Sequence, residues 1–349
     1  MIYKNVCIEG FEAYLPEQII TSEEVEDLLQ PTYERLRLPK GRLELFTGIK
    51  ERRYWPETTK PSDVSSKAGQ QILDKLNIDN SEIDALIHCS VCRDFLEPAT
   101  ASVVHSALKL PNHAVNFDIS NACLGMLSGI SILADMIESG RIKRGLLVSG
   151  EIGFPLLKRT ISHLNSDHTL NRQSFKPHFA SLTIGSAAAA IVVTHKDEVK
   201  KESPQLLCST DFSATEHNHL CQGTADSGMG DNNAPLMHTD SETLLHMGIE
   251  AAGNCWDKFT EELQWNKEDI DRCCTHQVGI AHSKMLFERI GLDPQLDYTT
   301  FPSLGNCGSA SIPLTTALAD ENDHLLKDHK VALLGIGSGI NCNMTALKW

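Results

Sequence analysis

Phe117-Asp-Ile-Ser-Asn-Ala-Cys-Leu-Gly-Met-Leu-Ser-Gly-Ile130 is the stretch of this 349-residue chain that decides its fold. A short β-like run meets small residues at Asn121-Ala-Cys123, and an apolar stripe of helical period follows, which predicts a strand, a turn and a helix. Cys123 is then expected at a helix N-terminus, where unpaired amides and the helix dipole favour thiolate over thiol. The alternative is that Cys123 is a small buried hydrophobic residue, as free cysteines often are.

Two further polar residues stand where a predicted strand ends or a predicted helix begins. His276 closes the apolar run that starts at Cys273, and Asn306 lies in the turn-rich segment that starts at Phe301. Taken alone, a histidine such as His276 is commonly a core or surface residue with its hydrogen bonds satisfied, and an asparagine such as Asn306 is commonly a helix N-cap. Because strand-end loops usually hold functional sites, the three residues together indicate a nucleophilic active site around Cys123.

An internal repeat relates the two ends of the chain. Glu82-Ile-Asp-Ala-Leu-Ile-His-Cys-Ser-Val91 resembles Asp269-Ile-Asp-Arg-Cys-Cys-Thr-His-Gln-Val278 at an offset of 187 residues. The pattern predicts two similar α/β halves, residues 1–195 and 205–349, joined by a charged connector without apolar period. The nucleophile comes from the first half and the His and Asn from the second, so a pocket between the halves is expected.

These residues resemble the thiolase-fold condensing enzymes, and within them the β-ketoacyl-acyl-carrier-protein synthase III group. The resemblance covers essentially the whole chain. It rests on Asn121-Ala-Cys123, His276, Gly305-Asn306, Thr47-Gly-Ile-Lys-Glu-Arg52 and the closing Gly337-Ser-Gly339. It implies an α/β thiolase fold in which two similar halves form five layers, αβαβα.

Two segments are most similar to one branch of that group. Residues 90–102 and 334–342 resemble the OleA group, condensing enzymes of olefin biosynthesis that join two fatty acyl-CoA molecules head to head. The resemblance implies an acyltransferase of lipid metabolism that acts as a homodimer on acyl-CoA. It implies no cofactor apart from the coenzyme A carried by the substrate.

The site roles follow from the same resemblance. Cys123 attacks an acyl thioester, and the acyl group moves onto the enzyme as a new thioester. The backbone amides of Cys123 and Ser338 form the oxyanion hole. His276 and Asn306 donate hydrogen bonds to the thioester oxygen of the second substrate and so stabilise its enolate.

Two enzymatic functions remain possible, and they differ in how the enolate forms. An unactivated acyl-CoA needs a base, and the resemblance assigns this role to Glu97, which would reach across a dimer into the partner's pocket. From the residues alone, a Glu before Pro98 is simply exposed. A malonyl donor on an acyl carrier protein would instead lose carbon dioxide and need no strong base. A third reading is a non-catalytic acyl-binding paralogue, since fold does not imply function.

Composition narrows the remaining classes. The net charge of −15 argues against a broad nucleic-acid surface. The apolar runs are too short to span a membrane, and the N-terminus reads as a strand rather than a signal peptide. Eleven cysteines, an odd number scattered along the chain, indicate a reducing compartment, so we expect a cytoplasmic protein.

Two weaker signals concern ligands. Arg52 and Arg53 belong to the one tight basic cluster near a family motif, and they favour CoA phosphates over a carrier protein only weakly; solvated surface charge is the alternative. The cysteines Cys89, Cys92, Cys273 and Cys274 lie in apolar strand-like runs, which predicts core cysteines rather than a metal site. The segment from Glu151 to Leu182 breaks periodicity and is expected to cap the substrate channel.

Overall fold

The structure, a computed structural model, describes residues 1–223 and 236–349. Its centre is a nine-stranded sheet with the order β11-β12-β13-β8-β1-β7-β6-β4-β5. The strands of the first half are β1 (Val6–Tyr14), β4 (Ala85–Cys89), β5 (Val115–Ile119), β6 (Arg144–Glu151) and β7 (Ala187–His195). The strands of the second half are β8 (Gln205–Ser213), β11 (Arg272–Thr275), β12 (Lys330–Gly337) and β13 (Asn341–Lys348).

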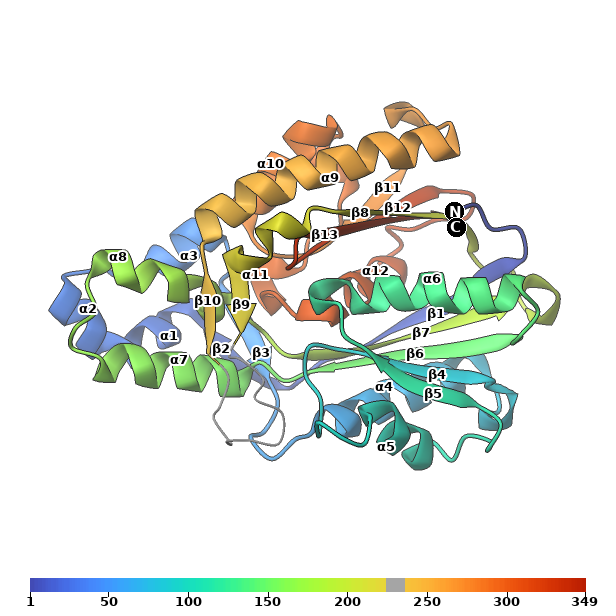
Figure 1. The fold of residues 1–349 in the computed structure, drawn as a ribbon, viewed down its shortest axis with the longest axis horizontal. Coiled ribbons are helices and arrows are strands. Elements are labelled where there is room, and N and C mark those ends of the chain that lie inside the picture. Colours follow the sequence, from blue (N-terminus) through green and yellow to red (C-terminus); the bar gives the residue numbers. More distant parts are fainter. Residues whose placement is uncertain (224–235) are drawn as a thin grey trace.

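The sheet divides into two parts that face each other across a helical layer. A single residue pair, Cys7 with Gln205, joins β1 to β8, and the two parts separate from there. Helices α6 (Gly125–Glu138) and α12 (Ser311–Glu321) fill the space between them (Figure 1). Helices α4 (Pro61–Leu76) and α5 (Thr100–Ala107) cover one outer face, and α9 (Ser241–Leu263) and α10 (Ile280–Ile290) cover the other. The predicted five-layer αβαβα arrangement is confirmed.

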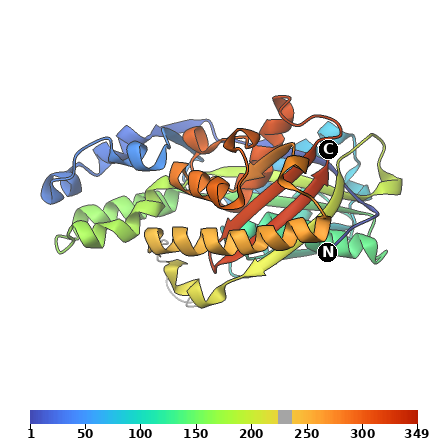
Figure 2. The same cartoon turned by 90° about the horizontal axis from the view of Figure 1, so that it is seen from above.

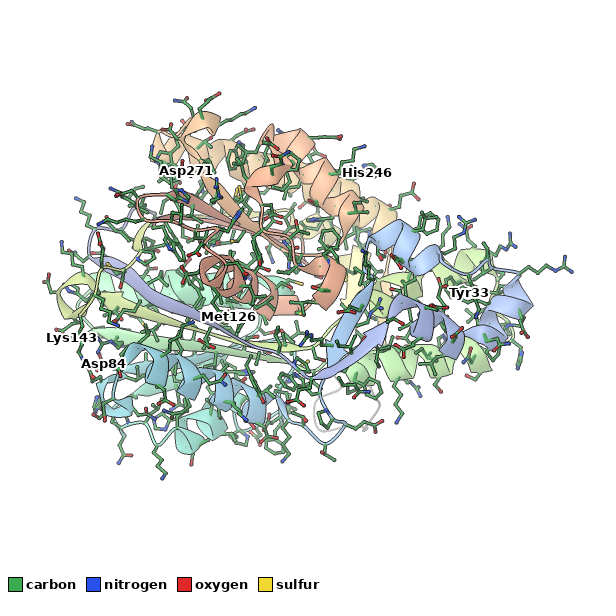
Figure 3. All side chains as sticks on the ribbon, turned by 180° about the vertical axis from the view of Figure 1, so that it is seen from behind. Tyr33, Asp84, Met126, Lys143, His246 and Asp271 are labelled. Atoms are coloured by element: carbon green, nitrogen blue, oxygen red, sulfur yellow. The ribbon has the colours of Figure 1, made fainter. Side chains whose placement is uncertain are left out.

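The central helices are apolar around most of their circumference because sheets cover them on both sides. Leu127, Ile130 and Leu133 of α6 belong to one core with Ile191 of the first half and Leu333 of the second. Met126, at the start of α6, lies in the middle of the molecule (Figure 3). The core thus continues through the layer that both halves share.

The repeat seen in the sequence corresponds to repeated structure. The turn η1 (Asn80–Glu82) and β4 correspond to η6 (Lys267–Asp269) and β11. The turn η2 (Ala122–Leu124), α6 and β6 correspond to η8 (Gly308–Ala310), α12 and β12. The chain passes from β7 to β8 through residues 196–204. The division at this connector into halves 1–195 and 205–349 stays a prediction.

A helical cap extends from one end of the layered body (Figure 2). It contains α1 (Ser22–Leu28), α2 (Gln30–Leu36), α3 (Arg42–Thr47), α7 (Phe154–Ser166), α8 (Arg172–Phe175) and the 3-10 segment η3 (Lys176–Thr183). It has its own core, which includes Leu29, Leu43 and Leu157, and Tyr33 marks its outer part in Figure 3. The predicted loss of periodicity after Glu151 is wrong for α7. Its buried residues Leu157, Thr160 and Leu164 recur at helical spacing and form one buried face.

The remaining elements are short. They are β2 (Gln18–Thr21), β3 (Glu51–Tyr54), β9 (Cys221–Gly223), β10 (Met237–Thr239), α11 (Phe301–Leu304) and the turns η4 (Lys196–Glu198), η5 (Thr215–Leu220) and η7 (Pro294–Leu296). The capping box at Thr21 and Glu24 starts α1 as the sequence predicts. Among the described residues, no helix is long and apolar enough to cross a bilayer.

Candidate active site

Cys123 lies in η2, the single 3-10 turn between β5 and α6. Ala122 before it has a φ of +44°, in the left-handed region, so the backbone turns sharply at the nucleophile. α6 itself begins at Gly125, two residues later. The expected position at the first residues of the helix is therefore corrected: the thiol sits on the turn that leads into α6.

The expected thiolate is also corrected. Burial, the nearby carboxylate of Glu151 and the thiol of Cys221 together raise the pKa of Cys123 to about 12. Desolvation and a neighbouring negative charge both disfavour a thiolate. Cys123 is therefore a thiol at neutral pH in the free protein.

The end of β12 packs directly against the nucleophile turn. A Cβ on Gly335 would lie 2.5 Å from Cδ2 of Leu124, and one on Gly337 would lie 3.0 Å from its Cγ and 3.6 Å from the amide nitrogen of Cys123. Only glycines allow this approach. Ser338 follows Gly337 in the turn between β12 and β13, and its assignment to the oxyanion hole stays a prediction.

His276 follows β11 and reaches the same end of β12. Its backbone amide donates to the carbonyl oxygen of Leu334 at 3.0 Å. The side chain is 4% exposed, and Nδ1 has no hydrogen-bond partner. Burial, with a smaller contribution from His282, lowers the pKa of His276 to about 3, so the imidazole is neutral across the physiological range.

Asn306 lies in the turn before α12, where three backbone and side-chain contacts fix it. Its backbone amide donates to the carbonyl of Thr183 at 3.0 Å, and its carbonyl accepts from the amide of Gly185 at 2.9 Å. Its Oδ1 accepts from the amide of Gly308 at 3.0 Å. With Oδ1 engaged, Nδ2 is the donor group of this side chain.

The structure thus gathers the Cys123 turn, the end of β12 and the Asn306 turn. The turn η2 contacts both β12 and η8, and η8 follows Asn306 by two residues. His276 joins them through β11, which pairs with β12 in parallel. The pattern predicted from three separate segments corresponds to one region between the halves.

Glu151 is a residue of this region that the sequence analysis missed. It ends β6 and is 4% exposed, and its carboxylate lies close enough to Cys123 to affect the pKa of that thiol. The signal was present: a charged residue closes the otherwise uncharged run Gly145-Leu-Leu-Val-Ser-Gly150 on a central strand. A buried carboxylate at a strand end is a candidate for a functional role.

The two arginines do not form the expected surface cluster. Arg52 is fully buried, and its guanidinium donates to Ser22 Oγ at 3.0 Å and to the carbonyl of Leu182 at 3.1 Å. The prediction that it binds CoA phosphates is wrong, because these contacts tie β3 to the cap away from solvent. Arg53 is half-buried and donates to the carbonyl of Pro16 at 3.2 Å, so its binding role stays a prediction.

Glu97 lies outside this gathering of residues. It is exposed on the loop between β4 and α5, next to the exposed apolar side chains of Phe95 and Leu96. Within the described ranges, no group of His, Cys, Asp and Glu has the arrangement of a metal site. Cys89, Cys273 and Cys274 are buried free thiols, and Cys92 is a half-buried one.

Comparisons with known proteins identify the family. Family profiles described as 3-oxoacyl-acyl-carrier-protein (ACP) synthase III and its C terminal part match residues 117–211 and 260–349. An acyl-CoA:acyl-CoA alkyltransferase of Shewanella oneidensis is 37% identical over 353 residues, which cover all of both chains. The chain belongs to the acyl-CoA:acyl-CoA alkyltransferase family. A second alkyltransferase, from Xanthomonas campestris pv. campestris, is 36% identical over the full length of both chains.

Solved structures agree with this assignment. Crystal structures of OleA from Xanthomonas campestris superpose on the alkyltransferase described here with TM-scores of 0.93 and 0.94, at 35% identity. Each superposition covers 100% of the present chain and 98% of the OleA chain. One such structure of OleA carries bound lauric acid and lauroyl-CoA, and others carry substitutions of a glutamate or a histidine.

Proposed function

We propose that this alkyltransferase-family enzyme joins two fatty acyl-CoA molecules by a Claisen condensation through an acyl-Cys123 intermediate. The full-length match to acyl-CoA:acyl-CoA alkyltransferases in sequence and structure carries the proposal. The decarboxylating synthase reading is weaker, since a synthase III of Clostridium novyi is only 24% identical. The non-catalytic reading is weaker because Cys123, His276 and Asn306 are all present in the expected segments.

The first half-reaction transfers an acyl group to the protein. The sulfur of Cys123 attacks the carbonyl carbon of an acyl-CoA, the bond from that carbon to the CoA sulfur breaks, and the proton of Cys123 ends on the departing CoA thiol. Because the thiol is protonated at rest, stabilisation of the tetrahedral oxyanion has to drive the step. The amides of Cys123 and Ser338 are the proposed donors, and the contact of Gly337 with the Cys123 turn supports them.

The second half-reaction forms the carbon–carbon bond. A base removes the proton next to the thioester of a second acyl-CoA, and the enolate carbon attacks the carbonyl of acyl-Cys123. The sulfur of Cys123 leaves and regains a proton, which gives a β-ketoacyl thioester and, after hydrolysis, a β-keto acid. A neutral imidazole and a primary amide both donate hydrogen bonds, so His276 and Asn306 suit the enolate oxygen.

Glu97 is the proposed base. Among the solved OleA structures, the substituted glutamate precedes the substituted cysteine by the same number of residues as Glu97 precedes Cys123. In a single protomer Glu97 is exposed, whereas proton abstraction from carbon needs a desolvated, positioned carboxylate. A homodimer in which the loop after β4 enters the partner's site would supply that burial.

Two features of the protomer support such a dimer. β5 is an edge strand of the nine-stranded sheet and is half-buried along its length. The neighbouring loop exposes Val91, Phe95 and Leu96, which is an unusual density of apolar side chains for a loop in contact with solvent. Burying them between two copies would bring Glu97 into the interface.

The substrate carrier and the compartment complete the proposal. CoA is the proposed carrier of both acyl groups, and a malonyl-acyl carrier protein is the alternative donor that the experiment below tests. The proposed reaction uses only protein side chains, protein amides, the two acyl-CoA substrates and the water that hydrolyses the product. The cytoplasm is the proposed compartment, because all eleven cysteines are free thiols, which a reducing environment preserves.

A product analysis tests the function directly. The purified protein is incubated with lauroyl-CoA alone, and in parallel with lauroyl-CoA and malonyl-acyl carrier protein, and the products are identified by mass. Release of CoA with a β-keto acid from lauroyl-CoA alone is expected, and Cys123→Ser should abolish it. Product only in the presence of malonyl-acyl carrier protein would overturn the proposal and select the decarboxylating synthase.

A further inference from the structure

Glu151 forms hydrogen bonds to two segments that are far apart in the sequence. Its Oε1 accepts from the amide of Val91 at 3.0 Å and from the amide of Ser309 at 3.1 Å. Its Oε2 accepts from the amide of Cys92 at 3.4 Å. Val91 and Cys92 begin the loop that carries Glu97, and Ser309 belongs to the turn that follows Asn306.

Ser309 extends these contacts to the nucleophile. Its Oγ accepts from the amide of Met126, in the first turn of α6, at 3.0 Å. Met126 is three residues after Cys123, and Figure 3 shows it at the centre of the molecule. The carboxylate of Glu151 and the hydroxyl of Ser309 therefore connect the Glu97 loop, the Asn306 turn and the start of α6.

Close packing leaves no freedom around this connection. A Cβ on Gly308, whose φ is +54°, would lie 3.0 Å from Oε1 of Glu151, and one on Gly125 would lie 2.8 Å from Oγ of Ser309. A rigidly held carboxylate that accepts several amide hydrogen bonds fixes the segments that donate them.

Glu151 is also a buried carboxylate. Burial raises the pKa of Glu151, and the amide hydrogen bonds oppose that shift. Three amide donors are the compensation expected for a buried carboxylate.

We propose that Glu151 is a positioning residue for the condensation step: it holds the enolate-stabilising turn in register with the Cys123 turn of its own site, and it fixes the loop that presents Glu97 to the partner's site. The inference rests on the proposed function and deepens it. Acylation needs only Cys123 and its oxyanion donors, whereas condensation also needs the Asn306 turn of the same protomer and the Glu97 loop of the other, and Glu151 anchors both kinds of segment in each protomer. Displacement of a catalytic group by about 1 Å lowers a rate by about a hundredfold, so the loss of Glu151 should affect condensation far more than acylation.

The test uses Glu151→Gln, which keeps the shape of the side chain. Its Oε1 can still accept from Val91 and Ser309, but the amide group would face the amide of Cys92, donor against donor. With lauroyl-CoA, acylation of Cys123 should persist while β-keto product falls by about a hundredfold. The alkylation of Cys123 by iodoacetamide at pH 8, followed by peptide mass, should become faster because a negative charge beside the thiol is removed.

A matched control and a second variant complete the test. Glu138 accepts from the amides of Lys4 and Asn5 at the far end of α6, so Glu138→Gln measures the effect of losing an amide-bonded carboxylate away from the site. It should leave both the ratio of condensation to acylation and the alkylation of Cys123 unchanged. Ser309→Ala removes the hydroxyl bond to Met126 and should lower condensation selectively even if Glu151→Gln does not fold.

Three outcomes would overturn the inference. The first is that condensation is unchanged in a folded Glu151→Gln variant, and the second is that acylation and condensation fall equally in that variant. The third is that condensation is unchanged in Ser309→Ala. Failure of the wild-type enzyme to form β-keto product would instead overturn the proposed function. The wild-type assay, run in parallel, separates the two cases, because the three outcomes count against the inference only where the wild type forms β-keto product.

Discussion

The protonated state of Cys123 sets how the free enzyme reacts with small electrophiles. Since its pKa is about 12, the thiolate fraction rises tenfold with each pH unit throughout the range in which the protein is handled. We expect the rate of Cys123 alkylation by iodoacetamide to keep rising from pH 7 to pH 10. The rate is followed at the Cys123 peptide, with Cys123→Ser as the blank. A plateau below pH 9 would show that the thiol is activated in the free protein, as the sequence alone predicts.

His276 and Asn306 separate the half-reactions. If both serve the enolate, His276→Ala and Asn306→Ala should still form acyl-Cys123 but lose condensation by about a hundredfold or more, the usual effect of removing an oxyanion donor. Intact mass after lauroyl-CoA treatment reports acylation, and β-keto product reports condensation. Equal loss of both reactions would contradict this division of roles.

The neutral state of His276 has its own consequence for pH. Its folded-state pKa of about 3 lies below the ordinary value, so the imidazole stays neutral between pH 5 and 8. Titration of His276 should therefore produce no inflection in the condensation rate over this pH range. Its contribution to stability is fully present above about pH 6.5 and is lost as the pH falls towards 3. A rate profile from pH 5 to 8 with an inflection that disappears in His276→Asn would contradict the neutral assignment.

At the scale of elements, Asp297 links the strand before His276 to the loop that follows α10. Its carboxylate accepts from the amide of Thr275 and its hydroxyl, both at 2.9 Å. Burial raises the pKa of Asp297 to about 7 despite these bonds. Because this folded-state value exceeds the unfolded one, the group's contribution to stability is fully present below about pH 4 and is lost as the pH rises through 7.

Asp297→Asn tests this coupling. The quantity to follow is the difference in free energy of unfolding between the wild type and Asp297→Asn. This difference should fall by at most about 4 kcal/mol as the pH rises from 4 to 8, which is the equivalent of a pKa shift of about three units. Denaturant titrations at several pH values measure the difference. A difference that is flat or rises with pH would mean that the buried carboxylate stays ionised.

The elements show how much the sequence could predict. The repeat around Glu82 and Asp269 predicted the strands β4 and β11, because apolar runs and turn residues act locally. The position of the thiol on a turn before α6, and its raised pKa, depended on Glu151 and on burial by β12, which are distant in the sequence. Arg52 was misassigned for the same reason: a basic cluster in the sequence does not reveal that Ser22 and Leu182 enclose one of its members.

At the scale of the whole molecule, the described residues of one protomer bring the segments of Cys123, His276 and Asn306 together and leave Glu97 outside this group. Glu97 is exposed on its loop next to the exposed side chains of Phe95 and Leu96, and the proposed dimer would cover this loop. One chain's sequence could suggest this residue only by resemblance. Its role depends on a surface that a second copy would complete.

The role of Glu97 can be tested by mixing two inactive proteins. Glu97→Gln keeps shape and removes basicity, so it should acylate normally while condensation falls by about a hundredfold or more. In a symmetric dimer, a hybrid of Glu97→Gln and Cys123→Ser has one site with an intact thiol from the first subunit and an intact carboxylate from the second. After subunit exchange of an equal mixture, condensation should return to about a quarter of the wild-type rate, because about half of the dimers are hybrids with one competent site each. Unchanged condensation in Glu97→Gln alone would remove the base, and no recovery despite exchange, followed with mass-tagged subunits, would show that Glu97 does not act across the interface.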